Sequence, residues 1–320
     1  MGTTAGLEVL RDLWDFPFLD LSVAFVPLEP LTLPRYPGNT LRGAFGWALR
    51  RSVCITHQPD CRQCRAYGSC AYAYIFETPI PQRLQGAPRI PYAPHPFVLR
   101  PPTRTSWQVG EPLHLGLHLL GRAVHLFPHV IQALETLARG GLGRHRTRLQ
   151  LLQVSHQGRV LYAQSQFLVP PRIQTLGEWV RQRLEAFQET TEIQVQFLTP
   201  TRIVHQGRLL RVPTLEGLLK ALSRRLSLLN QVHGNGQPFT LPGAWAAHLP
   251  EVQERVETLR PVEVRRFSRR QRQGHELHGF QGTLVLSGPV TPLLPLLLAG
   301  EPVHVGKSTS FGMGRYQIRR

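Results

Sequence analysis

The sequence predicts an α+β protein in which one plan of strands and helices occurs twice. Each half opens on an alternating, proline-containing strand, residues 21–33 and 193–204, and an amphipathic helix follows each strand. Gly38 opens the first helix, and Thr214 caps the second. The order of the remaining elements completes a β-α-β-β-α-β unit in each half, which is the ferredoxin-like plan. We therefore expect two tandem domains, residues 1–185 and 186–320.

The remaining elements follow from hydrophobic periodicity and turn residues. The first half adds a helix and three strands, expected at residues 128–139, 113–120, 149–154 and 160–167. The second half adds a hairpin closed around Gln273 and Gly274, with arms at residues 261–267 and 277–286. The proline-broken apolar run LLPLLLAGEP predicts a short helix, and residues 315–318 predict the last strand.

The charge of the chain indicates a polyanionic partner. Among 320 residues, 37 are basic and 20 are acidic, which gives a formal charge of +17. The only lysines are Lys220 and Lys307, and the other basic residues are arginines, which make bidentate phosphate contacts and stack on bases. A GC-rich genome would explain the preference for arginine over lysine. It would not explain the excess of basic over acidic residues.

A glycine-rich segment near the C-terminus, VHVGKSTSFGMGRYQI at residues 303–318, predicts a phosphate-binding loop. Glycine lets the backbone approach a ligand, and successive exposed N–H groups form an anion site. The expected RNA-contacting residues of this loop are Gly306, Lys307, Ser308, Gly312, Gly314 and Arg315. A mononucleotide P-loop is disfavoured, because five residues instead of four separate Gly300 from Gly306. A plain glycine-rich turn is the alternative.

All four cysteines fall in one window of the first half, with the spacing C-x6-C-x2-C-x5-C at Cys54, Cys61, Cys64 and Cys70. Two cysteines separated by two residues form half of a common zinc knuckle, and four thiolates complete a tetrahedral site. We therefore expect a cysteine-rich insertion that holds a structural zinc ion with no open position for catalysis. Reduced thiols without a metal are an alternative, and so are disulfides, which are rarer in cytosolic proteins.

The first arm of the predicted hairpin carries a run of arginines that we expect to contact phosphates: Arg265, Arg266, Arg269 and Arg270. Alternate residues of a strand share a face, so the run would present arginine on both faces. The alternative is an edge strand whose charges prevent pairing with another sheet.

The catalytic candidates lie around the first helix. The chain contains no serine-hydrolase elbow and no His-Glu-x-x-His motif, and its acidic residues are scattered, which disfavours metal-dependent phosphodiester hydrolysis. RNA can be cut without a metal, because its own 2′-OH attacks the adjacent phosphate with help from a base and from positive charge. We expect Tyr36 before the helix and His57 after it to share one rim with Arg42, Arg50 and Arg51. The alternatives for the base are His205 and His233.

Three segments together resemble a known family: residues 37–79, 266–288 and 303–318. In their order and spacing they resemble the CRISPR precursor-RNA processing endoribonucleases of the repeat-associated RAMP superfamily. The resemblance implies tandem ferredoxin-like domains of the RNA-recognition type and a glycine-rich loop that helps to hold the repeat RNA. It also implies metal-independent cleavage within repeats that leaves 2′,3′-cyclic phosphate ends on guide RNAs.

In this family a histidine after the first helix is often helped by a tyrosine and a lysine, and His57 and Tyr36 are the nearest matches here. No lysine lies in that half, so the resemblance requires Arg50 or Arg51 in its place. The implied partners are CRISPR repeat RNA, the processed guide RNA and subunits of a CRISPR effector complex.

Two other functions fit parts of the pattern. One is a non-catalytic RNA-binding subunit of a CRISPR effector complex, built on the same fold. The other is a zinc-containing DNA-binding protein. No signal peptide and no apolar run of membrane-spanning length is visible, so we expect a cytoplasmic protein with no membrane partner.

Overall fold

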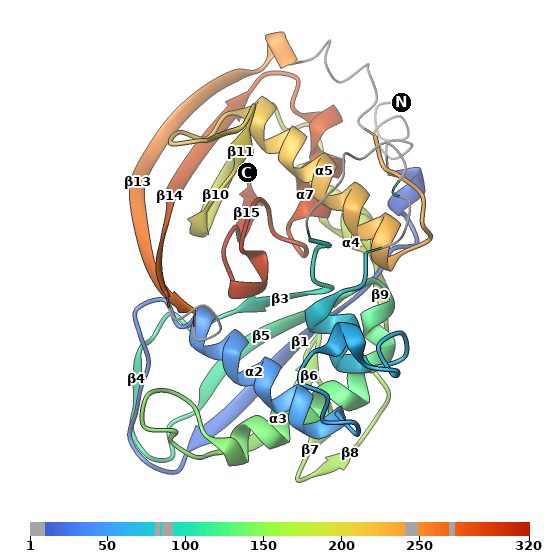
Figure 1. Cartoon of the computed structure of the whole chain (residues 1–320). Coiled ribbons are helices and arrows are strands. Elements are labelled where there is room, and N and C mark those ends of the chain that lie inside the picture. The colour runs from blue at the N-terminus through green and yellow to red at the C-terminus, as the bar shows by residue number, and fades with distance from the viewer. Residues whose placement is uncertain (1–9, 81–83, 85–91, 241–248, 269–272) are drawn as a thin grey trace. The chain divides into compact units, whose positions relative to one another are not determined.

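Two compact units make up the chain in the computed structural model, which describes residues 10–80, 84, 92–240, 249–268 and 273–320 (Figure 1). The N-terminal unit comprises residues 17–173 with residues 232–234. The C-terminal unit comprises residues 174–231 and 235–320 together with the residues before Pro17.

The N-terminal unit follows the expected β-α-β-β-α-β order. Its main elements are β1 (Pro17–Pro27), α2 (Gly38–Val53), β3 (Phe97–Arg100), β5 (Leu113–Leu120), α3 (Phe127–Gly140) and β6 (Leu149–His156). The strands lie in the order β3-β5-β1-β6 with antiparallel neighbours, so the first strand sits between the third and the fourth. The sheet continues into β7 (Arg159–Ala163) and β8 (Gln166–Phe167), and a separate small sheet joins β2 (Leu31–Thr32) to β4 (Ser106–Trp107).

The core of this unit lies between the sheet and its two long helices, which pack together on one face (Figure 1). Alternate side chains of β1, from Leu19 to Phe25, are fully buried in it. The apolar face of α2 is the one the sequence predicts: Leu41, Phe45, Ala48 and Leu49 are all buried. The strand thus buries every second side chain and α2 buries side chains at helical spacing, and both sets pack into one core.

The C-terminal unit repeats the plan. Its main elements are β10 (Glu192–Thr201), α5 (Leu215–His233), β13 (Gln253–Ser268), β14 (Gln273–Ser287), α7 (Leu294–Gly300) and β15 (Tyr316–Arg319). The strand order β13-β14-β10-β15 again places the first strand between the third and the fourth. Two short strands, β11 (Val204–His205) and β12 (Arg208–Leu209), form a separate two-stranded sheet. The expectation of two tandem ferredoxin-like domains in an α+β fold is therefore confirmed.

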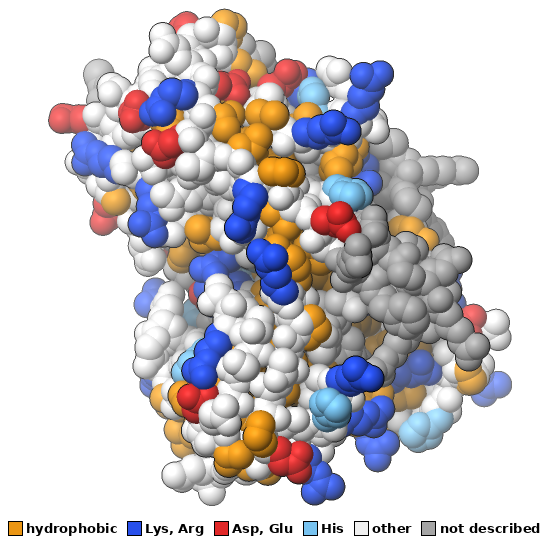
Figure 2. Space-filling view, turned by 90° about the vertical axis from the view of Figure 1, so that its left-hand side faces the viewer, with side chains coloured by type: hydrophobic (Ala, Val, Ile, Leu, Met, Phe, Trp, Pro, Cys, Tyr) orange, Lys and Arg blue, Asp and Glu red, His pale blue; other side chains and the backbone are white. Residues whose placement is uncertain are grey.

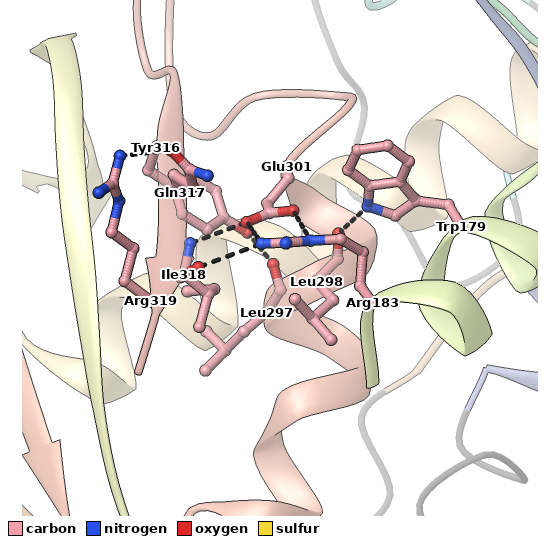
Figure 3. A network of polar contacts seen from close by, with 9 residues as sticks. All are labelled: Trp179, Arg183, Leu297, Leu298, Glu301, Tyr316, Gln317, Ile318 and Arg319. Carbon is pink, nitrogen blue, oxygen red and sulfur yellow. Dashed lines mark hydrogen bonds and ion pairs between the residues drawn. The ribbon is translucent and has the colours of Figure 1, made fainter. Parts of the chain in front are cut away.

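The boundary between the units differs from the expected division at residue 185. Helix α4 (Leu176–Leu184), which follows the short strand β9 (Gln174–Thr175), belongs to the C-terminal unit. Its Trp179 Nε1 donates to the carbonyl of Leu298, 3.1 Å away, and Arg183 pairs with the buried Glu301 at 3.2 Å (Figure 3). The expected division placed this segment in the first domain, because a nine-residue helix gives no signal of the partner it packs against.

Two expected strands are shorter than their apolar patterns. The segment at 160–167 bends between β7 and β8, where Gln164 and Ser165 adopt φ values of 50° and 59°. The segment at 21–33 breaks after Pro27, since a proline cannot donate to a sheet ladder. Within the described residues, no helix is long and apolar enough to cross a membrane.

Candidate functional site

Helix α2 separates two residues that the sequence interpretation placed on one rim. Tyr36 lies just before the helix, and His57 lies beyond its C-terminal end. Sixteen residues at 1.5 Å each put about 24 Å between these ends. The expected constellation of Tyr36 with His57 is therefore not assembled in the structure. His57 is exposed and has a positive φ of 53°, as suits a residue in a surface turn.

The two arginines of the last turn of α2 point to different surroundings. Arg50 donates to the carbonyl oxygens of Gln58, at 2.6 Å, and Pro59, at 3.2 Å, so it braces the segment after the helix. Arg51 is exposed, and its guanidinium lies 5.7 Å from the centre of the Trp47 ring. Of the four catalytic candidates, Arg50 and His57 thus belong to one segment, while Tyr36 lies far from both.

The four cysteines follow α2 and precede β3, and all four line one cavity of about 220 Å³. They are free thiols, each half-buried. A 3₁₀ turn at Cys61–Gln63 closes the C-x2-C pair, with the N–H of Cys64 donating to the carbonyl of Cys61 at 3.1 Å. The hydroxyl of Thr56 lies 3.2 Å from the sulfur of Cys64. The segment therefore gathers the thiols around one hollow, as the spacing predicts.

The four sulfur atoms are not close enough to one another to bind one metal ion. No group of three or more His, Cys, Asp or Glu side chains in the described part of the chain is arranged to hold a metal. The donor set suits zinc in number and kind, since four cysteines line one cavity.

The glycine-rich loop lies between α7 and β15, and its glycines fold it tightly against the chain after β10. Gly306 and Gly314 have φ values of 81° and 73°. A Cβ atom on Gly306 would lie 2.3 Å from the carbonyl oxygen of Arg202, and one on Gly314 would lie 1.8 Å from that of Val305. The N–H of Lys307 donates to Arg202 at 2.9 Å. These positions require glycine for close backbone packing, whatever the loop binds.

The residues predicted to bind RNA in this loop differ in exposure. Gly312 and Gly314 are buried, while Gly306, Ser308 and Arg315 are half-buried. Lys307 is exposed at the turn of the loop. The side chain of Lys307 is thus the part of the loop most open to a ligand.

Arg265 and Arg266 of the arginine run lie near the C-terminal end of β13, which forms a long curved hairpin with β14 (Figure 1). In the backbone register of the hairpin, Arg265 lies opposite Glu276 and Arg266 lies opposite His275. Arg269 and Arg270 lie outside the described residues. Across the described surface, basic side chains are spread over the face shown in Figure 2, with acidic ones among them.

A polar cluster beside α2 joins Arg42 to two residues that the sequence interpretation did not include. Arg42 Nη2 lies 2.9 Å from His95 Nε2, and Thr78 Oγ1 lies 3.2 Å from His95 Nδ1. Because a guanidinium only donates, Nε2 accepts from Arg42, and Nδ1 carries the proton that it donates to Thr78. His95 is half-buried and neutral in this arrangement. Its two partners lie 53 and 17 residues away in the chain, so no local spacing indicates the cluster.

Two stacked rings extend this cluster along α2. Tyr72 and Phe76 lie 5.5 Å apart with ring planes inclined by 8°. The Arg42 guanidinium lies 5.2 Å from the Phe76 ring, and that of Arg50 lies 5.7 Å from the Tyr72 ring. We call these four residues the arginine–aromatic array. Gly46 makes room for it, because a Cβ there would lie 2.8 Å from the Phe76 ring.

The alternative bases are placed elsewhere. His233 is fully buried, with its ring held between the hydroxyl of Tyr74 at 2.9 Å and the carbonyl of Pro94 at 2.7 Å, which makes it a structural residue of the N-terminal unit. His205 lies in the short strand β11 of the C-terminal unit.

Comparison with known proteins agrees with the resemblance seen in the sequence. Residues 195–316 match a family model described as CRISPR-associated endoribonuclease Cas6, and residues 16–174 match a model named AF_1859_N and described as an N-terminal domain. The second half of the chain thus resembles the Cas6 endoribonuclease family. Each matched region covers the core of one ferredoxin-like unit.

Individual relatives of this chain are distant. An uncharacterized protein of Archaeoglobus fulgidus is 27% identical over 299 residues, covering 90% of this chain and 93% of the relative. Among solved structures, Thermus thermophilus Cas6 is 18% identical with a TM-score of 0.53, and a Cas6 product complex is 20% identical with the same score. Both matches cover 95% of this chain and 99% of the other. At these identities the structural likeness establishes the fold.

Proposed function

We propose that this protein is an endoribonuclease that cuts CRISPR repeat RNA in precursor transcripts and so releases guide RNAs. The observation that carries the proposal is the match of residues 195–316 to the Cas6 endoribonuclease family on a chain built from two ferredoxin-like units. A similar structure is a Cas6 product complex, and another is a partial Cas6-RT-Cas1–Cas2 complex, 16% identical with a TM-score of 0.54. Repeat RNA, the guide RNA product and other CRISPR proteins are accordingly the proposed partners.

The proposed chemistry is attack by the 2′-OH of the RNA on the adjacent phosphorus, with no metal in the reaction. The new O2′–P bond gives a 2′,3′-cyclic phosphate, and the 5′-oxygen of the next nucleotide leaves. The protein has to take a proton, stabilise the charged phosphorane and align the three atoms. Arg42 and Arg50 on α2 supply positive charge beside aromatic rings, a combination that suits phosphate and base together.

The exposed Lys307 of the glycine-rich loop is the proposed contact to the RNA backbone in the C-terminal unit, with the half-buried Arg315 at the end of the same loop. A net charge of +17 would add long-range attraction that weakens with salt. The arginines at the end of the β13–β14 hairpin, Arg265 and Arg266, extend the proposed basic surface.

A non-catalytic RNA-binding role is the second candidate. One observation favours it: the tyrosine and the histidine that match the family pattern, Tyr36 and His57, lie at opposite ends of α2. A chain with those two residues apart would bind repeat RNA and leave it intact.

The experiment that separates these functions uses an RNA copy of the CRISPR repeat from the source genome, labelled at its 5′ end, with purified full-length protein in excess chelator. We expect one specific cut in the repeat and none in a control hairpin of scrambled sequence. Tight binding without any cut would show the non-catalytic role, and a preference for duplex DNA would exclude both candidates.

We also propose that Cys54, Cys61, Cys64 and Cys70 close around one structural zinc ion, which would draw the four thiolates lining the cavity together. Elemental analysis of protein purified without chelator should give about one zinc per chain. Replacing Cys61 and Cys64 by serine should release the metal and lower the unfolding midpoint. Protein that holds no metal and reacts at all four thiols would exclude this site.

A further inference from the structure

The polar cluster beside α2 contains a histidine whose surroundings are built for proton transfer. Among the histidines whose burial the structure describes, only His95 and His205 are half-buried, while the others are either exposed or buried. His95 is held on both sides by side chains, Arg42 at Nε2 and Thr78 at Nδ1. The ring also lies nearly parallel to Phe97, at 5.9 Å and 28°, which fixes its plane. Its tautomer and its orientation are therefore both determined before any ligand binds.

The backbone beside His95 is strained. Thr78, which accepts the Nδ1 proton, has a φ of 29° although it carries a β-branched side chain. It directly follows a π-helical turn at Ala73–Glu77. Strained residues and π-helical turns both occur frequently at functional sites. The conformation places the Thr78 hydroxyl against the histidine ring.

Arg42 occupies the nitrogen that a general base would use. Nε2 of His95 accepts a proton from Arg42 at 2.9 Å, so this hydrogen bond occupies the lone pair that a general base would use. A phosphate is a stronger acceptor for arginine than a neutral imidazole, because the bond gains a second charge and can be bidentate. An RNA phosphate at Arg42 would therefore draw the guanidinium away and expose Nε2 within reach of the ribose beside that phosphate.

We propose that His95 is the general base of the cleavage reaction and that Arg42 stabilises the phosphorane, a proposal that rests on the function proposed above. His95 Nε2 takes the proton of the 2′-OH as the O2′–P bond forms. The P–O5′ bond breaks, the leaving 5′-oxygen takes a proton from water, and His95 returns its proton to water. Thr78 is a positioning residue, because its hydroxyl keeps the proton on Nδ1 and leaves Nε2 as the base.

The test compares four proteins on the 5′-labelled repeat RNA in excess chelator: the wild type, His95→Ala, His57→Ala and His129→Ala. His57 is the rival base, and His129 is an exposed histidine on α3 of the same unit. We expect His95→Ala to lower the single-turnover rate about a hundredfold or more while the Kd for RNA stays within about threefold. Added imidazole should restore part of the rate to His95→Ala. The other two variants should cut at the wild-type rate.

The outcomes separate this proposal from the proposed function. A wild type that binds repeat RNA without cutting it would contradict both the endoribonuclease function and the role of His95. A wild type that cuts, with His95→Ala cutting equally fast, would overturn the role of His95 alone, and a loss of rate in His57→Ala would transfer the role to that residue. If His95→Ala does not fold, His95→Asn keeps a hydrogen-bonding side chain of similar size, and wild-type cleavage by that folded variant would overturn the proposal equally.

Discussion

The two ferredoxin-like units share one strand order but place their distinctive segments after different helices. In the N-terminal unit the long connection follows the first helix, α2, and carries the four cysteines, the π-helical turn and His95. In the C-terminal unit the distinctive segment follows the second helix, α7, and is the glycine-rich loop. The connection at the same place in the N-terminal unit, between α3 and β6, is a short turn closed by a bridge between Leu142 and Thr147.

The two segments differ in whether side chains or backbone form their distinctive features. The N-terminal connection works through side chains, because Arg42, Thr78 and His95 meet by their functional groups. The C-terminal loop is shaped through its backbone, because Gly306 and Gly314 lie against carbonyl oxygens that leave no room for a side chain. We infer that the N-terminal unit carries the chemistry and the C-terminal unit carries a rigid binding loop.

The largest expected effect is on the backbone-built loop. Gly314→Ala should lower the free energy of unfolding of the C-terminal unit by about 3 kcal/mol or more, because the new Cβ would lie 1.8 Å from the Val305 oxygen at a φ of 73°. Gly110→Ala is the matched control, since Gly110 has a φ of 81° with nothing within 4 Å of the added Cβ. It should cost only about 1–2 kcal/mol. Equal losses in urea unfolding would mean that close packing does not shape the loop.

Two carboxylates, the half-buried Asp20 and the buried Glu301, should give the units opposite responses to acid. Burial alone would raise the pKa of Asp20 on β1, but His118, Arg100 and His156 outweigh it and hold that pKa well below the ordinary 3.8. Asp20 pairs with Arg100 and lies 3.1 Å from His118. The stability that ionised Asp20 contributes should be present above pH 4 and lost as the pH falls further. Asp20→Asn should therefore lower the free energy of unfolding by about 2 kcal/mol at pH 7 and by less at pH 2.

Glu301 of the C-terminal unit shows the reverse shift. Burial raises its pKa above the ordinary 4.5, although the N–H of Ile318 and the guanidinium of Arg183 both oppose that rise (Figure 3). Relative to Glu301→Gln, which does not titrate, the wild type should therefore gain stability as the pH falls through this raised pKa toward 4.5. Unfolding curves from pH 7 to pH 2 measure both trends, and parallel slopes for the two variants would contradict the opposite shifts.

A smaller effect should come from the glycine that admits the arginine–aromatic array. Gly46→Ala would push on the Phe76 ring, 2.8 Å from the new Cβ, and so disturb Arg42 and His95. We expect about a tenfold slower single-turnover cleavage, equivalent to about 1.4 kcal/mol. Gly43→Ala on the same helix meets nothing within 4 Å and should leave cleavage unchanged while stabilising α2 by about 0.5–1 kcal/mol. Identical cleavage rates for the two variants would separate the array from catalysis.

The smallest effect concerns binding by the C-terminal unit. Lys307→Ala should weaken the Kd for repeat RNA a few-fold and reduce the salt dependence by about one charge, with the rate at saturating RNA unchanged. Lys220→Ala is the control, because Lys220 is an exposed lysine on α5 paired with Glu216. If titrations at several salt concentrations give both variants the same dependence of Kd on salt, RNA does not contact the loop through Lys307.

The fold could be predicted from the sequence because its signals are local. The apolar face of α2, the strand at Leu113–Leu120 and the order of elements in each half follow from periodicity within a few turns of chain. The terminal loop shows the limit of such signals. Its three glycines were interpreted as a nest for a ligand, whereas Gly314 is required by the nearby Val305 carbonyl.

The candidate site could be predicted only in part, because its residues meet through tertiary contacts. The cysteines are close in sequence and do line one cavity. His95 lies 53 residues from Arg42, between two prolines, in a stretch with no periodicity. The pairing of His57 with Tyr36 seemed close only along the chain, and the length of α2 separates the two residues.

The most direct test of metal-free RNA cleavage is the chemical structure of the product ends. Repeat RNA cut in excess chelator should give, by mass spectrometry, a 2′,3′-cyclic phosphate on the upstream fragment and a 5′-hydroxyl on the downstream one. The same RNA with a 2′-deoxyribose at the cut position should bind with unchanged Kd and remain intact. Cleavage of the deoxy substrate, or cleavage that requires added magnesium and leaves a 5′-phosphate, would contradict 2′-OH attack.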